Sequence, residues 1–256
     1  MLKKRFIAVL IIRDGQVVQS VRFKHTNVIH YDPAHAVECF NKWSIDELVM
    51  LNVSPSPDSR PAFLETVASI SGDCFVPLSV GGWINNSQYA QDLLANGADK
   101  LVVNTIIADK PKLVNALSKK FGRQCIVASI DVTHDNKKDN SLVMVDRGRR
   151  STGSDLRTWA ERAERLGAGE IFFNSINHDG ARKGYDLTNL TLLCRSVKIP
   201  VIAFGGVFSW NHLLQGIDAG ADAVAAANIL HYTEHSCRKA KKFLMQSGVP
   251  VRKEMH

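Results

Sequence analysis

Short apolar runs alternate along the chain with segments that have a helical period or turn-forming residues. Turn and capping residues open many of the expected helices, as in Asp32-Pro33 and Asn86-Ser87, and glycine closes several, as in Leu166-Gly167. Strands that alternate with helices are typical of a parallel sheet covered by helices. The expected strands begin near Phe6, Leu48, Val76, Leu101, Ile126, Ile171, Val201 and Ala223.

The chain nearly repeats itself half a length later. Residues 76–107 read VPLSVGGWINNSQYAQDLLANGADKLVVNTII, and residues 199–230 read IPVIAFGGVFSWNHLLQGIDAGADAVAAANIL. Each copy is an apolar strand, a glycine-rich turn, a helix, a Gly-Ala-Asp turn and a second strand. Eight strands in two such halves predict an α/β fold, a single (β/α)8 TIM barrel made by duplication. We place the half-barrels at about 1–122 and 123–245, with a C-terminal tail at 246–256, in one domain over residues 1–256.

The segment between Val17 and His35 is longer than the other connections. We expect it to hold a small hairpin and a lid loop on the catalytic side of the barrel. Catalytic groups of such barrels sit at the C-terminal ends of the strands, so residues can be assigned to a face from their position alone.

Composition narrows the class of protein. With 45% hydrophobic residues in 256, the chain can bury one large core. Its net charge of +7 is dispersed, and the densest basic cluster, RGRR at 147–150, is interpreted as a solvated loop. Phosphorylated small molecules therefore explain the basicity without nucleic acid as a partner. The apolar run at 6–12 is short and ends in the turn 13–15, which favours a first barrel strand over a signal peptide or membrane span.

Cysteine and histidine usage predicts no metal or cofactor. The five cysteines are scattered and never spaced as CxxC, which argues for a reducing cytoplasm and against a disulfide frame or zinc site. None lies in a Gly-x-Cys-x-Gly elbow, so no cysteine is a candidate nucleophile of that type. His25, His30 and His35 have loose spacing and are interpreted as loop histidines.

Two glycine-rich turns predict two anion cradles on the catalytic face. Gly82 follows the third strand, with Asn104 and Thr105 after the fourth, and Gly205-Gly206 and Asn228 follow the seventh and eighth strands. Such turns present free backbone N–H groups to phosphates. The repeat places the cradles across the barrel from each other, which suits a long ligand with a phosphate at each end. Tight packing of the glycines is the alternative.

Asp131 is the acid–base candidate. It ends the apolar strand CIVASID at the catalytic face, where a carboxyl group with a raised pKa suits proton transfer. A loop aspartate that caps a turn is the alternative. Ser175, Asp179 and Gly180 follow the sixth strand and could line the same site.

Several motifs together resemble the cyclase subunit of imidazole glycerol phosphate synthase. They are MLKKRFIAVLIIRDGQVV, SIDELVMLNVS, VPLSVGGWI, NGADKLVVNT, RQCIVASID, LGAGEIFFNSINHDG, GYDL and IPVIAFGG, and they cover essentially the whole chain. The resemblance implies a duplicated barrel that binds a substrate with two phosphates. It also implies a separate glutaminase at the bottom face, whose ammonia passes through the barrel to a site with two catalytic aspartates.

The catalytic face departs from that family. Asp131 matches the second catalytic aspartate, but Ile11 stands where the first is expected, and Ile11 also matches Asp131 when the repeat superposes strands one and five. Isoleucine cannot transfer a proton. In addition, Asn52 stands in place of a carboxylate and Gln19 in place of a lysine of the first loop.

The first phosphate turn departs as well. Trp83 replaces the third glycine of the family's Gly-Gly-Gly turn, while its repeat partner is Gly206. We expect the indole to crowd a phosphate and to remove the left-handed backbone conformation that glycine allows. Asn85 replaces an arginine. The second cradle is better kept, although Phe204 replaces a small residue.

The bottom face, by contrast, retains the family's charges. Arg5, Glu47, Lys100 and Glu170 precede strands one, two, four and six and match a ring of four alternating charges that gates the ammonia channel. A salt-bridge ring that seals the barrel floor is the alternative. Asp99 and Gln124 match positions by which family members contact the glutaminase.

Three functions remain open. In the first, the chain is a diverged paralogue that receives ammonia from a glutaminase. It then supports amidine formation on a surface-polysaccharide sugar, together with a third, sugar-modifying enzyme. Alternatively, it is an authentic histidine-pathway cyclase, with Asp14 or a water replacing the missing carboxylate. The last option is a noncatalytic ammonia conduit that docks two enzymes.

Overall fold

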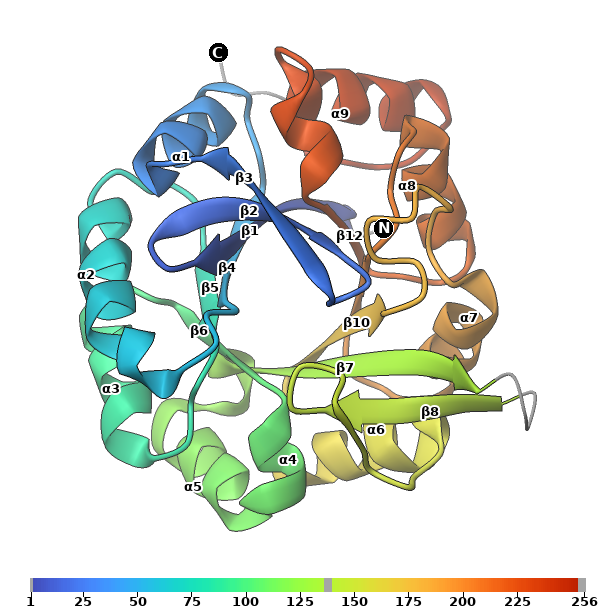
Figure 1. Cartoon of the computed structure of the whole chain (residues 1–256). Helices are drawn as coiled ribbons and strands as arrows, with labels where there is room; N and C mark the ends of the chain where they lie inside the picture. Colours follow the sequence, from blue (N-terminus) through green and yellow to red (C-terminus); the bar gives the residue numbers. More distant parts are fainter. Residues whose placement is uncertain (1, 136–139, 253–256) are drawn as a thin grey trace.

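The computed structural model describes residues 2–135 and 140–252. Within them, eight parallel strands close into a barrel (Figure 1), because the last strand pairs with the first, from Arg5 opposite Ala223 to Ala8 opposite Ala226. The expected (β/α)8 TIM barrel is therefore confirmed, and each predicted strand start falls within two residues of an observed one. The barrel strands are β1 (Arg5–Arg13), β4 (Glu47–Asn52), β5 (Leu78–Gly81), β6 (Lys100–Val103), β7 (Ile126–Asp135), β10 (Glu170–Ser175), β11 (Val201–Phe204) and β12 (Ala223–Ala226).

Helices surround the barrel and connect its strands (Figure 1). They are α1 (Pro33–Lys42), α2 (Arg60–Ser71), α3 (Ser87–Ala95), α4 (Thr105–Asp109), α5 (Pro111–Phe121), α6 (Leu156–Leu166), α7 (Leu187–Ser196), α8 (Trp210–Asp218) and α9 (Ser236–Gln246), with the short 3-10 helices η1 (Pro57–Ser59), η2 (Arg123–Cys125) and η3 (Asn228–His231). The capping residues Asp32, Asn86, Asp155 and Asp186 accept hydrogen bonds from first-turn N–H groups, as their positions predict. No helix in the described ranges is long and apolar enough to cross a bilayer.

Successive side chains of each strand point to opposite faces of the sheet, and they form two apolar layers, one toward the helices and one inside the barrel. On β1, Phe6, Leu10 and their neighbours of like parity pack toward the helices, whereas Ile7 and Val9 belong to a second cluster inside the barrel. Both sets are almost fully buried. A parallel sheet covered on both faces needs such nearly continuous apolar strands.

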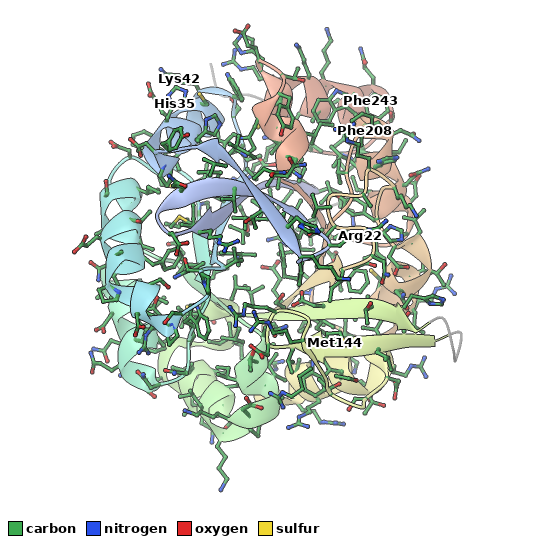
Figure 2. All side chains as sticks on the ribbon, viewed as in Figure 1. Arg22, His35, Lys42, Met144, Phe208 and Phe243 are labelled. Atoms are coloured by element: carbon green, nitrogen blue, oxygen red, sulfur yellow. The ribbon has the colours of Figure 1, made fainter. Side chains whose placement is uncertain are left out.

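Two hairpins stand on the C-terminal ends of strands. The first, β2 (Gln16–Val21) and β3 (His25–His30), is the hairpin expected between Val17 and His35, and it crosses the mouth of the barrel in Figure 1. Arg22 at its turn lies over the ring of strands (Figure 2).

The second hairpin was not expected. Strand β7 continues past Asp131 and pairs with β8 (Asn140–Val145), which pairs in turn with β9 (Arg150–Ser151). The apolar run at 142–145 was a signal for this strand that the sequence analysis did not use, since Val143 and Val145 are buried in the core beside Val132. The two hairpins follow β1 and β7, the equivalent strands of the two halves.

Candidate functional site

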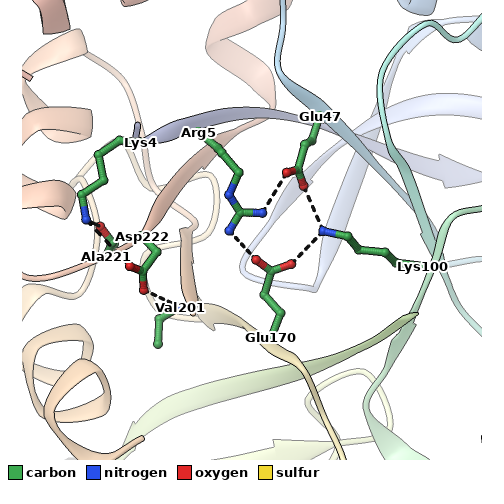
Figure 3. Close-up of polar contacts among 8 residues, drawn as sticks. All are labelled: Lys4, Arg5, Glu47, Lys100, Glu170, Val201, Ala221 and Asp222. Atoms are coloured by element: carbon green, nitrogen blue, oxygen red, sulfur yellow. Dashed lines mark hydrogen bonds and ion pairs between the residues drawn. The ribbon is translucent and has the colours of Figure 1, made fainter. Parts of the chain in front are cut away.

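Four charged side chains close the floor of the barrel (Figure 3). Arg5 donates to Glu47 Oε1 at 2.8 Å and also to Glu170, while Lys100 Nζ lies 3.3 Å from Glu47 Oε2 and 3.1 Å from Glu170 Oε2. Each cation contacts both carboxylates, so the four form a closed ring. The strand starts of β1, β4, β6 and β10 bring these residues together, as their positions before the strands predict.

The ring is largely shielded from water. The Glu47 and Glu170 side chains are 9% and 8% exposed. Burial lowers the pKa of Arg5, but the charges and hydrogen bonds of Glu170 and Glu47 outweigh it and leave that pKa above its usual value. Removing one member would leave the ring with an unbalanced charge in a place shielded from water, which is costly.

Asp99 and Gln124 lie exposed near the same end of the barrel. Asp99 Oδ2 accepts a hydrogen bond from Leu78 N at 2.7 Å, and its repeat partner Asp222 accepts one from Val201 N at 3.0 Å. The Asp99 carboxylate thus fixes the start of β5 whether or not it also contacts another protein.

At the opposite end, a first cavity of about 530 Å³ contains Asp131. Asp131 is 7% exposed; Ser129 Oγ donates to its Oδ1 at 3.2 Å and Asn104 Nδ2 donates to its Oδ2 at 3.0 Å. Burial raises the pKa of Asp131 to about 7; the Ser129 hydrogen bond opposes this, and the charge of Asp179 adds to it. A carboxyl group of this kind can both give and take a proton near neutral pH.

Ile11 lines the same cavity. It brings a methyl-rich side chain, 6% exposed, where the repeat predicts a counterpart of Asp131. Asn52 also lines the cavity, but its amide is used locally: Nδ2 donates to Ser59 Oγ and Oδ1 accepts from Ser54 N. Of these two equivalent positions, Asp131 brings a carboxyl group to the cavity and Ile11 does not.

Gly82, Asn104 and Thr105 also line the first cavity, as the first cradle predicts. Trp83 differs from expectation: its φ of 56° shows that it keeps the left-handed backbone that we expected the indole to remove. Its Nε1 donates to Ser54 O at 3.0 Å, and the Arg147 guanidinium lies 4.9 Å from its ring centre. These contacts hold a conformation that a bulky residue rarely adopts.

A second cavity of about 430 Å³ contains the other cradle. Gly205, Gly206 and Asn228 line it, as the second cradle predicts, whereas Asp179 and Gly180, which were expected beside Asp131, line this cavity instead of the first. The turn needs glycine, since both Gly205 and Gly206 have positive φ and a Cβ on either would collide with neighbouring atoms. Asn228 Oδ1 is buried and has no hydrogen-bond partner in the described part of the chain.

Two residues predicted to line the site, Ser175 and Asp179, make contacts that stabilise the surrounding loops. Ser175 is buried and its carbonyl accepts from His178 N and Asp179 N, and it is absent from the described lining of both cavities. Asp179 accepts from Ser20 Oγ at 2.6 Å and from Phe23 N at 3.3 Å. The Asp179 carboxylate therefore ties down the β2–β3 hairpin.

Sequence reasoning missed Arg147 and Asn174. Arg147 belongs to the basic cluster interpreted as a solvated loop, yet it lines the first cavity and stacks on Trp83. Asn174 also lines that cavity, with a buried Oδ1 that has no partner among the described residues. Its signal was available, because Asn174 lies one residue before the end of β10, opposite Asp131.

Of the histidines of the hairpin region, His30 lies near both His35 and His231. His30 Nε2 lies 3.1 Å from Nδ1 of His231, and the ring of His35 lies near that of His30. No group of three or more potential metal ligands occurs in residues 2–135 and 140–252.

Known proteins resemble this chain over nearly its whole length. The model of a family described as "Histidine biosynthesis protein" matches residues 5–236. The chain is 40% identical to the imidazole glycerol phosphate synthase subunit HisF of Chlorobium phaeovibrioides, over 98% of this chain and 100% of that protein. It has the same identity and coverage with the HisF subunits of Chlorobium luteolum and Pelodictyon phaeoclathratiforme.

Proposed function

The chain belongs to the histidine biosynthesis protein family as a HisF-like subunit of imidazole glycerol phosphate synthase, and from this we propose that it receives ammonia from a separate glutaminase. The ammonia passes through the barrel toward Asp131. We further propose that the chain has diverged to support amidine formation on a surface-polysaccharide sugar, together with a third, sugar-modifying enzyme.

The contrast between the two ends of the barrel carries the proposal. At the floor, Arg5, Glu47, Lys100 and Glu170 keep a complete ring of compensating charges. At the top, Ile11 replaces one of two expected proton-transfer groups. Selection for an ammonia inlet and relaxed selection for the original ring closure would produce this pattern.

The interior between the two ends supports the same direction of transfer. Inward-facing Ile7, Val9, Val49, Val102 and Val127 form an apolar cluster above the ring. Such a lining favours neutral ammonia over the ammonium ion, since a charge would lose its hydration there. The ring is closed in this structure, so ammonia enters when its ion pairs open.

Asp131 is suited to a single proton transfer at the outlet. With a pKa of about 7 it is partly ionised near neutral pH, and it can take a proton from ammonia as nitrogen attacks carbon. The chemistry attributed to two aspartates needs a second group. Asp14 is a poor substitute, because its side chain is 64% exposed and is paired with Arg13.

One observation favours the authentic cyclase as a second candidate. The 40% identity with HisF subunits extends over nearly the whole chain. That candidate requires turnover without a carboxylate at position 11. The noncatalytic conduit differs from our proposal in that Asp131 would take no part in chemistry.

The test uses the purified chain, a glutaminase subunit from the same organism, and the two-phosphate substrate of the histidine pathway. We expect a complex by size-exclusion chromatography and glutamine hydrolysis that rises on complex formation. With ammonium chloride, turnover should lie on the order of 10²-fold or more below that of the Chlorobium luteolum HisF subunit assayed in parallel. Equal turnover would refute the divergence, and absence of a complex would refute ammonia transfer.

A further inference from the structure

The two cavities of the catalytic face meet at one side chain. Phe204, the last residue of β11, lines both the cavity that holds Asp131 and the cavity that holds Gly205, Gly206 and Asn228. Among the residues that the structure describes, it is the one shared by the two linings. Phe204 therefore lies at the boundary of two chambers, the first with Asp131 and the second with the glycine cradle, and its side chain is called the wall below.

The wall is supported from one side. The rings of Phe204 and Phe172 lie 4.9 Å apart between centres and 32° from parallel. Phe204 is 4% exposed and Phe172 is 1% exposed. Two buried rings in this arrangement have little freedom to move aside, because each fixes the rotamer of the other.

The internal repeat shows that the barrel does not need this aromatic ring. Gly81 is the repeat partner of Phe204, at the same end of β5, and Gly82 is the partner of Gly205. A side chain at Gly81 would collide with Val102, so the first half has no equivalent wall. The aromatic residue at position 204 is therefore a feature of the second half alone.

The second chamber has the features of a site for one phosphate group. Gly205 and Gly206 adopt positive φ in the turn that leads to α8, and they leave backbone N–H groups near the cavity. Arg182 lines it and stacks on Phe208, a partly exposed ring that also lines the cavity. Asn228 also lines the chamber, and its amide NH2 group is the part of that side chain that can donate a hydrogen bond to a phosphate oxygen.

We propose that Phe204 is a specificity-determining residue that restricts each chamber to its own short ligand. The second chamber binds a phosphomonoester, and a ligand with phosphates at both ends cannot bridge to the first chamber. This inference rests on the proposed function, in that it names the kind of ligand that a diverged outlet still accepts. Its test measures binding without ammonia, so its failure is distinguishable from failure of ammonia transfer.

The wild-type protein supplies the first measurement. Isothermal titration at about 0.3 M salt, which screens nonspecific attraction, compares alkanediol bisphosphates with hydroxyalkyl monophosphates of equal length. A ligand that engages two sites at once gains about 10²–10⁴-fold in affinity, and the gain vanishes when geometry forbids bridging. We expect the two ligand types to differ by about twofold or less, the factor that two identical ends supply.

Variants test the wall directly. Phe204→Ala should merge the chambers and tighten the bisphosphate at least about tenfold relative to its monophosphate. Phe204→Leu is the matched control, because it keeps a branched apolar side chain in the wall and should retain the wild-type ratio. Thermal melts of both variants verify that each is folded.

Three outcomes would overturn the proposal. They are a wild-type bisphosphate that binds tenfold or more tighter than its monophosphate, a wild-type protein that does not bind the monophosphate, and a folded Phe204→Ala variant with an unchanged ratio. The wild-type comparison decides the matter if Phe204→Ala does not fold.

Discussion

Ile11 and Asp131 face one cavity from equivalent positions of the two half-barrels. Ile11 pairs with Leu51 on β4, and Asp131 pairs with Asn174 on β10. Leu51 and Asn174 are themselves repeat partners, each four residues after a floor glutamate, Glu47 or Glu170. The strand register thus confirms that the first half presents a hydrocarbon where the second presents a carboxyl group.

Restoring the missing carboxyl group should restore part of the family chemistry. Ile11→Asp places a second proton-transfer group in the Asp131 cavity, and we expect turnover of the histidine-pathway substrate with ammonium chloride to rise at least about tenfold. Ile11→Asn is the matched control, since it is polar and of similar size but does not transfer protons. An equal rise in both variants would show that polarity, not proton transfer, limits the reaction.

Disrupting the ring of charges at the barrel floor should lower the glutamine-dependent rate more than the ammonium-dependent rate. Lys100→Ala removes one cation from the ring, and we expect the glutamine-dependent rate of the glutaminase complex to fall at least tenfold more than the ammonium-dependent rate. The control is Lys4→Ala, whose side chain pairs with Asp222 outside the ring (Figure 3). Equal loss of both rates in Lys100→Ala would indicate a structural seal and contradict a gate.

The raised pKa of Asp131 predicts a pH-dependent stability. The folded state holds a proton up to pH about 7, whereas the unfolded carboxyl releases it near pH 3.8. The contribution to stability is therefore complete below about pH 4, falls as pH rises, and is lost above about pH 7, by an amount on the order of 4 kcal/mol.

Asp131→Asn lacks this titration and serves as the reference. In urea denaturation, the difference in free energy of unfolding between Asp131→Asn and wild type should shift in favour of the variant by several kcal/mol from pH 4 to pH 8. Asp179 also has a raised pKa, and its charge raises the pKa of Asp131, so the difference reports the titration of Asp131 as it is coupled to Asp179. A difference that stays constant with pH would mean that Asp131 does not titrate in this window.

The barrel could be predicted from the sequence because the signals for its strands and helices are local and repeated. Apolar runs, caps and the internal repeat predict the strands, and the repeat predicts the two cradles without any contact information. Arg147 and the wall at Phe204 could not be predicted in the same way. Their roles depend on which residues meet across the barrel mouth, such as Trp83 beneath Arg147 and Phe172 beside Phe204, and no pattern along one strand encodes such a meeting.

A buried ion pair between α9 and the turn before β4 is another long-range contact with a measurable consequence. Lys241 Nζ lies 2.6 Å from Asp46 Oδ1 and donates to Ser44 O, while Asp46 Oδ2 accepts from Phe6 N; both charged side chains are 2% exposed. Lys241→Met leaves the Asp46 charge buried without its cation, so we expect the free energy of unfolding to fall by about 3–5 kcal/mol.

Lys242→Met is the matched control, because the neighbouring Lys242 is exposed on the same helix. Its substitution should change stability by less than about 0.5 kcal/mol. Both values come from chemical denaturation at constant pH. If Lys241→Met were no less stable than Lys242→Met, the pair would not hold the C-terminal helix to the barrel.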